Sequence, residues 1–219
     1  MRNKPIFGIA LFILFSTFIS QNKFSINKFK IKEIEIENNN ILEDQELIKV
    51  FSFLYSKNII FLNYHELKKN IDQKSFINKI EIKKIFPDKL VIKVFEKEPI
   101  AILINTDQKK FYLGKKFDLI EYRKIIKYVD LPVVEGELNS FKILFKNLTK
   151  INFPTEETVS YRFFEVDRWN IEMSDKKLLK LPTKNHTEGL LNFMSIKEEP
   201  NFDKFKIFDY RLNNQLILK

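Results

Sequence analysis

Residues 80–101 constrain the fold more than any other stretch, because their sequence, IEIKKIFPDKLVIKVFEKEPIA, predicts two strands joined by a tight turn. Pro87 and Asp88 indicate the turn, since proline presets φ and aspartate can bond its own backbone. Apolar and charged residues alternate on both sides of it, which is the period of a half-buried strand. The apolar positions are Ile80, Ile82, Leu90, Ile92 and Val94. Because Pro99 ends this pattern and a new apolar run follows at once, we expect the hairpin to end one domain and lead directly into the next.

The residues before the hairpin predict a strand and two helices. The strand is expected over residues 29–37, with Phe29 and Ile31 out of phase, as at a bulge or a late strand start. One helix is expected over residues 43–55, and a second begins at a capping box opened by Asn63 and reaches about residue 72. The apolar stripe of the first helix consists of Leu47, Phe51, Leu54 and Tyr55. The resulting order, β-α-α-β-β, predicts a small α+β domain in which two helices cover one face of a three-stranded sheet.

The residues after the hairpin predict a mixed β domain. Its expected strands are residues 100–104, 109–113, 117–120, 169–173, 178–181, 208–212 and 215–219. An apolar stripe predicts a helix over residues 138–151, and Asn185 with Glu188 predicts a capping box before a second helix. Trp169 is in phase with the apolar residues of its strand, so we expect it in the core, with a partner contact as the alternative.

The N-terminal residues predict a transmembrane helix. An uncharged run, residues 5–19, follows a short basic start; as a helix it would be about 22 Å long, against a hydrocarbon core of about 30 Å. We expect an uncleaved anchor, because a cleavage site after Ser20 would place Phe18 where a small residue is needed. A signal peptide and a buried helix are the alternatives, and the lysines that follow leave the orientation open from charge alone. The residues assigned to the anchor are Ile6, Phe7, Ile9, Leu11, Phe12, Ile13, Leu14, Phe15, Phe18 and Ile19.

Composition limits the chemistry that the chain can perform. It has no cysteine, which excludes disulfides, thiolate metal sites and cysteine nucleophiles. Neither His65 nor His186 has a partner at metal-ligand spacing, and the carboxylates are too interleaved with lysines to single out an acid–base pair. We therefore expect no enzyme, no metal and no cofactor. The net charge of +9 could suggest nucleic acid, but lysines and glutamates are interspersed, as in KIKEIEIE at residues 30–37, which is typical of a solvated surface.

The hairpin also carries a family resemblance. Its motif is Lys83-Lys84-x-Phe86-Pro87-x-x-Leu90-x-Ile92-x-Val94-x-Glu96-x-x-Pro99-x-Ala101. A membrane-proximal β-α-α-β-β unit that ends in this pattern resembles the POTRA domain of the FtsQ/DivIB family of bacterial cell-division proteins, with Phe86 in place of the more frequent tryptophan. Weaker motifs continue the resemblance at residues 131–136, at Arg168-Trp169 and at residues 208–212.

The resemblance implies a non-enzymatic, single-pass membrane scaffold of the divisome. Residues 1–22 would form a cytoplasmic stub and anchor, residues 23–99 a POTRA domain, and residues 100–219 a β domain. The protein would lie in the cell inner membrane with periplasmic C-terminal domains, and its partners would be FtsB- and FtsL-like proteins, with no nucleic acid and no small-molecule substrate. The first alternative is a POTRA-containing envelope secretion or assembly protein, and the second, ranked below it, is a basic nucleic-acid-binding protein.

The C-terminal residues form the predicted partner site. Residues 215–219 are short and apolar and predict an edge strand, which can pair with another chain because it has no proline or interior charge. The resemblance implies that division partners dock at this end of the β domain. The predicted partner-binding residues are Tyr210, Arg211, Leu212, Gln215, Leu216, Ile217 and Leu218. The alternative is that the strand is paired on both sides; Asp209 and Arg211 are expected to form structural ion pairs.

Overall fold

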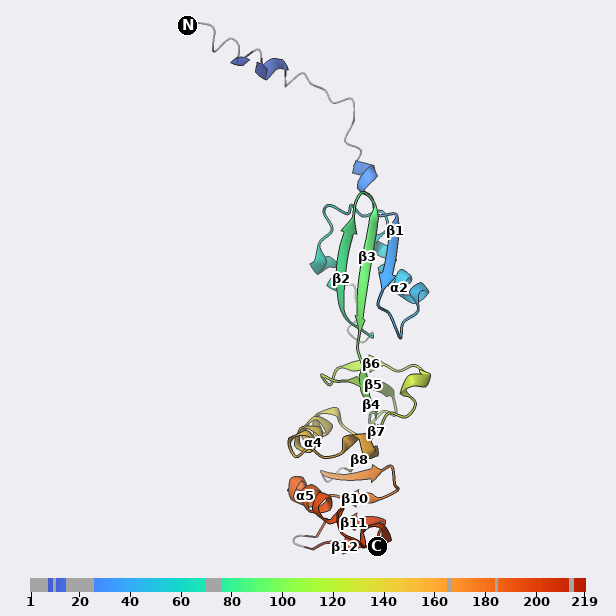
Figure 1. The fold of residues 1–219 in the computed structure, drawn as a ribbon, viewed down its shortest axis with the longest axis vertical. Helices are drawn as coiled ribbons and strands as arrows, with labels where there is room; N and C mark the ends of the chain where they lie inside the picture. Colours follow the sequence, from blue (N-terminus) through green and yellow to red (C-terminus); the bar gives the residue numbers. More distant parts are fainter. Residues whose placement is uncertain are drawn as a thin grey trace. The chain divides into compact units, whose positions relative to one another are not determined.

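The computed structural model describes residues 8–9, 11–14, 26–69, 76–164, 167–183, 185–212 and 215–219. The chain divides into two compact units (Figure 1). The first unit consists of Met1–Asn70 with Ile80–Val94, and the second unit consists of Ile71–Lys79 with Phe95–Lys219.

The first unit has the predicted order of elements, β-α-α-β-β. Its strands form a three-stranded sheet in the order β1-β3-β2, with β1 parallel to β3. The elements are the short 3-10 helix η1 (Ile26–Phe29), β1 (Glu33–Glu37), α2 (Asp44–Phe51), the 3-10 helix η2 (Ser52–Leu54), α3 (Tyr64–Lys69), β2 (Ile77–Ile85) and β3 (Lys89–Glu96). The β2–β3 hairpin is the one that the alternating pattern predicts, and the turn between its strands contains Pro87 and Asp88.

The first strand starts later than residues 29–37 predict. Ile31 does not pair with the sheet, because its N–H donates to the Lys57 carbonyl oxygen at 2.9 Å and its own carbonyl accepts from Ser56 at 3.1 Å. The parallel pairing with β3 begins only at Glu33. The two out-of-phase residues therefore reflect a late strand start, which is one of the two explanations that the pattern allows.

The helices of the first unit follow their sequence signals with one exception, and the predicted end of the second helix, at about residue 72, lies outside the described residues. The Asn63 Oδ1 accepts the backbone N–H of His65 at 2.9 Å, which is the predicted N-terminal cap of α3. Leu47, Phe51 and Leu54 are buried as the stripe predicts, whereas Tyr55 is exposed. Tyr55 follows the tighter 3-10 turn η2, where the 3.6-residue period no longer holds, so its inclusion in the stripe was wrong.

The second unit is built on a nine-stranded mixed sheet in the order β12-β11-β10-β9-β8-β7-β4-β5-β6. Its strands are β4 (Pro99–Ile104), β5 (Lys110–Gly114), β6 (Leu119–Glu121), β7 (Val133–Glu135), β8 (Thr158–Phe164), β9 (Arg168–Met173), β10 (Leu178–Lys180), β11 (Ile207–Asp209) and β12 (Ile217–Leu218). Its helices are η3 (Ile126–Tyr128), α4 (Leu138–Lys150), η4 (Thr155–Glu157), α5 (His186–Ile196) and η5 (Phe202–Lys204). The fold is therefore of the predicted α+β class, with a large sheet in its second half.

The core of the second unit joins α4 to the middle of this sheet and α5 to β11, beside its β12 end. Phe141 of α4 contacts Tyr161 of β8 and Trp169 of β9, with ring centroids 5.2 and 6.0 Å apart. On α5, Phe193 meets Phe208 of β11 edge to face at 5.1 Å. Trp169 is thus a core residue, as its phase in the strand predicts.

Two strands in the centre of the sheet have no counterpart among the sequence-based expectations. β7 has only three residues and lies parallel to both β4 and β8, so it lacks the hairpin signals of a local pair. In β8 the register shifts between Thr158 and Ser160, which breaks the alternation that would identify a strand.

Helix α5 begins where predicted but not by the predicted cap. Asn185 has a φ of 58°, in the left-handed region, and its side chain makes no capping bond. Instead, its carbonyl oxygen accepts the Glu188 N–H at 3.0 Å. The predicted capping box is therefore wrong, because a left-handed N-cap directs the side chain away from the first helical turn.

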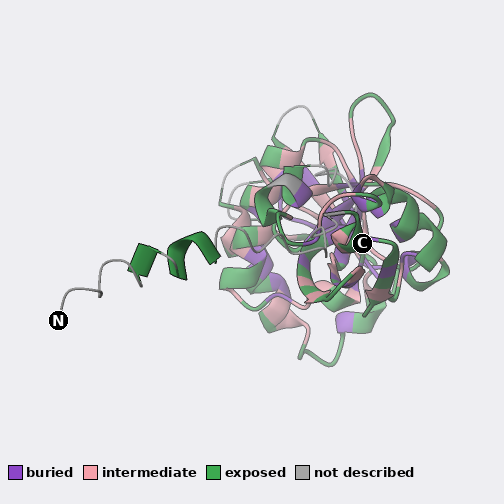
Figure 2. Cartoon of the chain, turned by 90° about the horizontal axis from the view of Figure 1, so that it is seen from above, coloured by how far each residue is buried: buried purple, intermediate pink, exposed green. Residues whose placement is uncertain are grey.

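The N-terminal residues are described only in part. Residues 8–9 and 11–14 are helical and exposed (Figure 2). Within the residues that the structure describes, no helix combines the length and apolarity needed to cross a membrane. Of the predicted anchor, Ile6, Phe7, Phe15, Phe18 and Ile19 lie outside the described residues.

Candidate functional site

Strand β12 is the end strand of the nine-stranded sheet as described (Figure 1). It pairs with β11 alone, in antiparallel register, with Leu218 opposite Phe208 and Ile217 opposite Asp209. Edge strands are the places where a second chain can extend a sheet. The strand order agrees with the predicted C-terminal edge strand, but β12 comprises only Ile217–Leu218 where residues 215–219 were predicted. Its role in docking stays a prediction.

The backbone of β12 presents a defined residue to the outside of the sheet. Ile207 and Lys219 exchange two hydrogen bonds, at 2.9 and 3.1 Å. In an antiparallel pair, bonded and non-bonded residue pairs alternate, so the N–H and C=O of the next residue, Leu218, point away from β11. These are the two groups to which an added strand would first bond.

The side chains of the edge are apolar and half exposed. Ile217 and Leu218 each expose 37% of their surface, and Leu212, which precedes β12, exposes 53%. Leu216 differs from them, because it packs against the core of the second unit. Of the predicted partner-binding residues, Leu212, Gln215, Ile217 and Leu218 are thus the exposed apolar or amide side chains that a partner could contact, together with the guanidinium of Arg211.

Tyr210 supports the edge from inside. It is buried, and its hydroxyl donates to the Asn192 side-chain oxygen on α5 at 3.1 Å. Its ring lies so close to Gly189 that a Cβ there would be 3.2 Å from Tyr210 Cγ. Burial raises the pKa of the phenol above its usual range. Tyr210 therefore holds the end of β11 against α5, and a partner could reach it only through the backbone.

Asp209 and Arg211 form an ion pair with each other. The guanidinium donates from Nε to Oδ1 at 2.8 Å and from Nη2 to Oδ2 at 2.6 Å, while the Arg211 backbone N–H also reaches Oδ1 at 3.1 Å. These bonds, chiefly those of the side chain, lower the pKa of Asp209, and the carboxylate in turn raises the pKa of Arg211. The bidentate pair fixes the chain where it leaves β11, which ends at Asp209 and does not continue to residue 212 as predicted.

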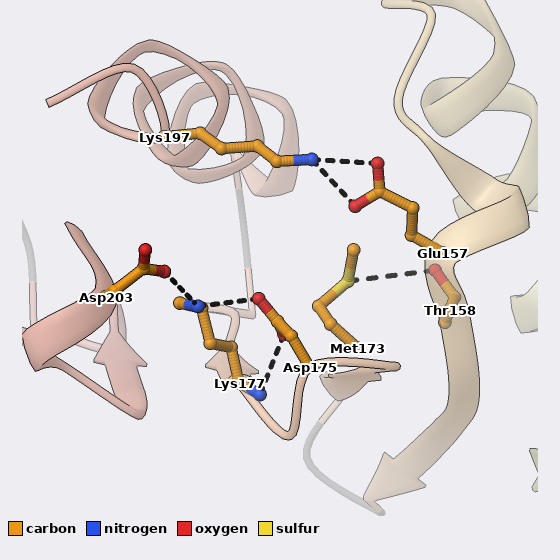
Figure 3. A network of polar contacts seen from close by, with 7 residues as sticks. All are labelled: Glu157, Thr158, Met173, Asp175, Lys177, Lys197 and Asp203. Atoms are coloured by element: carbon orange, nitrogen blue, oxygen red, sulfur yellow. Dashed lines mark hydrogen bonds and ion pairs between the residues drawn. The ribbon is translucent and has the colours of Figure 1, made fainter.

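A polar network between the β9–β10 turn and η5 holds the segment that leads into β11 (Figure 3). The Lys177 ammonium, in the β9–β10 turn, contacts Asp175 at 2.6 Å and Asp203 of η5 at 3.0 Å, and it lies 4.5 Å from the Phe202 ring centroid. Burial alone would lower the pKa of Lys177, but its bonds to the two carboxylates outweigh burial and raise it. The network therefore positions η5, and with it β11, against the β9–β10 hairpin.

A second ion pair in Figure 3 restrains α5. Lys197, at the end of α5, contacts both carboxylate oxygens of Glu157 in η4, at 2.7 and 2.9 Å. Neither this pair nor the Lys177 network is among the sequence-based expectations, because their partners lie 26 and 40 residues apart.

The described residues contain no group of three or more histidine, aspartate or glutamate side chains that could hold a metal ion. His65 is exposed beside the cap of α3, and His186 opens α5. What the described site offers is a strand edge and its supports, which is an arrangement suited to binding.

Comparisons with known proteins identify relatives for both units. Residues 29–97 match the family described as "POTRA domain, FtsQ-type". The chain is 25% identical over 162 residues to the cell division protein FtsQ of Rickettsia bellii, which covers 74% of this chain and 61% of the relative. It is 31% identical over 108 residues to the cell division protein DivIB of Clostridium acetobutylicum, covering 49% of this chain and 43% of the relative. With DivIB of Clostridium botulinum strain Loch Maree, the identity is 32% over 142 residues, covering 62% and 53%. The chain thus spans about half the length of the curated relatives that it matches.

Proposed function

We propose, because the chain belongs to the FtsQ/DivIB family of cell-division proteins, that it is a non-enzymatic scaffold of the bacterial division machinery. Residues 1–22 would anchor it in the inner membrane by a single pass, with a cytoplasmic N-terminus. Residues 23–99 and 100–219 would then form a POTRA domain and a β domain outside the cytoplasm. A shared membrane raises the effective concentration of scaffold and partner, so a small docking surface is enough.

The docking surface is the β12 edge. The observation that carries this proposal is the outward-facing N–H and C=O of Leu218 on an end strand, flanked by the exposed side chains of Ile217 and Leu218. Strand addition would take its affinity from backbone hydrogen bonds and its specificity from the alternate side chains. The partners are divisome membrane proteins, FtsB- and FtsL-like, that contribute an extended segment.

The test separates the backbone of the edge from its side chains. Leu218→Pro removes the outward N–H, whereas Leu218→Ala keeps it, and neither touches the bonds between Ile207 and Lys219. The chain is purified from membranes of cells that also produce FtsB- and FtsL-like proteins, and the captured partners are quantified. We expect Leu218→Pro to abolish most of the capture and Leu218→Ala to reduce it less.

The opposite edge of the sheet provides a matched control. The Gly114 N–H donates to the Asp118 carbonyl, so by the same alternation the N–H of Glu121 in β6 faces away from β5. Glu121→Pro should therefore leave partner capture unchanged. Equal loss of capture in Glu121→Pro and Leu218→Pro, with both variants folded by circular dichroism, would disprove docking at β12.

A further inference from the structure

We infer that one end of the first unit is a contact surface for an anionic lipid bilayer. This end, called the tip below, consists of residues 26–32, 57–62 and 83–88. The inference rests on the proposed membrane location, and it adds to that location a second, specific contact between the folded unit and the lipid headgroups.

The three segments of the tip are joined to one another by backbone hydrogen bonds, a ring contact and the bonds of one lysine. The Ile59 N–H donates to the Phe29 carbonyl at 2.9 Å, and the Phe29 and Phe86 rings meet edge to face at 6.4 Å. The Lys84 ammonium donates to the carbonyl oxygens of Ile60 and Leu62 at 3.3 and 3.2 Å. Figure 1 shows the same arrangement, with η1 beside the turn between β2 and β3. The tip is therefore one continuous surface.

Large apolar side chains are exposed on the tip. Phe61 exposes 80% and Phe86 59% of its surface, and Ile60 and Ile85 are also exposed. Single exposed apolar residues are common, but four on adjoining segments form a patch that marks a contact surface. Phenylalanine and aliphatic side chains on the apolar face of an interfacial segment become buried at the boundary between headgroups and acyl chains.

The positive charge of the tip favours contact with an anionic surface. Its ionisable side chains are six lysines and one aspartate: Lys28, Lys30, Lys32, Lys57, Lys83, Lys84 and Asp88. The aspartate is already paired, since Asp88 Oδ2 lies 3.0 Å from Lys32 Nζ. Lysines around an apolar patch attract anionic lipids, and each lysine near the surface adds to this attraction. The tip therefore carries an excess of positive charge beside its apolar patch.

The covalent connection limits how far the tip can be from the proposed anchor. Eight residue steps lead from Ile19, the end of the uncharged run, to Asn27 in η1. A fully extended chain of eight residues spans at most about 29 Å. The tip is thus always within reach of the bilayer surface, and lipid is favoured over a protein partner as the occupant because it is present at this distance at all times.

The experiment uses the absence of cysteine to place a single label on the full chain. Phe61→Cys and Phe86→Cys are labelled with an environment-sensitive fluorophore, and Glu37→Cys serves as the control, because Glu37 is exposed at the other end of β1. The chain is reconstituted into vesicles of phosphatidylethanolamine and phosphatidylglycerol with a doxyl-labelled lipid as quencher. We expect blue-shifted, quenched emission at positions 61 and 86 and neither change at position 37.

A charge variant tests the electrostatic part. Lys28→Glu, Lys30→Glu and Lys83→Glu combined should abolish quenching at position 61 while the chain still floats with the vesicles. Pure phosphatidylcholine vesicles should give the same loss with the lysines intact. Thermal unfolding of each variant shows that the unit has kept its fold.

The outcomes distinguish this inference from the proposed function. A chain that floats with the vesicles but is as water-exposed at positions 61 and 86 as at position 37 overturns the lipid contact alone. A chain that does not float overturns the membrane location, and the lipid contact with it. A label that becomes shielded only when membrane proteins are added identifies the tip as a protein-binding surface and also overturns the inference.

Discussion

The two ends of the nine-stranded sheet are built differently. At the β6 end, Tyr112 of β5 is buried among three aromatic rings, those of Phe76, Tyr122 and Tyr128, with centroids 5.0–5.8 Å away. At the β12 end, the outer strand has two residues with exposed apolar side chains, and ion pairs and one tyrosine hydrogen bond hold its neighbours.

The difference shows how one sheet can have both a closed edge and an open one. In β6, the Ile120 side chain is buried and the last residue is the charged Glu121. At the β12 end, none of the residues from Gln215 to Leu218 is charged. A charged residue on an edge strand discourages pairing with other chains. The β12 end is therefore the one that retains the capacity to pair.

Tyr112→Ala is expected to have the largest effect, because it removes the centre of the aromatic packing at the closed end. Truncating a buried aromatic side chain costs about 3–5 kcal/mol. Urea denaturation measures the loss, and Tyr112→Phe, which loses the hydroxyl's bonds to the Arg123 carbonyl oxygen and to the Ile125 backbone, should cost about 1 kcal/mol. A loss below about 1 kcal/mol for the alanine variant would contradict the distinction between the ends.

Gly189→Ala is expected to have an intermediate effect at the open end. Helix propensity favours alanine by about 1 kcal/mol, but its Cβ would press on the ring of Tyr210, which is buried and bonded to α5. We expect a net loss of about 1 kcal/mol in urea denaturation. In a Tyr210→Leu background the same substitution should cost less or stabilise; an unchanged cost there would assign the effect to another contact.

Asp209→Asn is expected to have the smallest effect and to depend on pH. Because Arg211 lowers the pKa of Asp209 in the folded state, the pair stabilises the fold above the unfolded pKa of about 3.9 and loses this contribution as pH falls through the lower, folded value. Wild type should exceed the variant by about 1 kcal/mol at neutral pH. Stability curves that stay parallel down to acidic pH would show that the pair contributes nothing.

Local patterns were sufficient for much of the fold. The β2–β3 hairpin, α4 and the β9–β10 hairpin were predictable, because each depends on neighbours in sequence and on one buried face. The pairing of β7 between β4 and β8 was not, since parallel neighbours come from distant segments. For the candidate site, the edge strand could be predicted, but the inward orientation of Tyr210 and the burial of Lys177 depend on α5 and η5, which no local pattern positions.

Because β12 has a single neighbour, it can form only after other parts of the second unit have folded. β12 can form only on β11, β11 pairs with β10 in parallel after the α5 crossover, and β10 pairs with β9. The edge thus comes into being only when these strands and the helix between them are in place. If partners dock at β12 as proposed, a second unit that is only partly folded cannot bind them, because its edge strand is not yet formed.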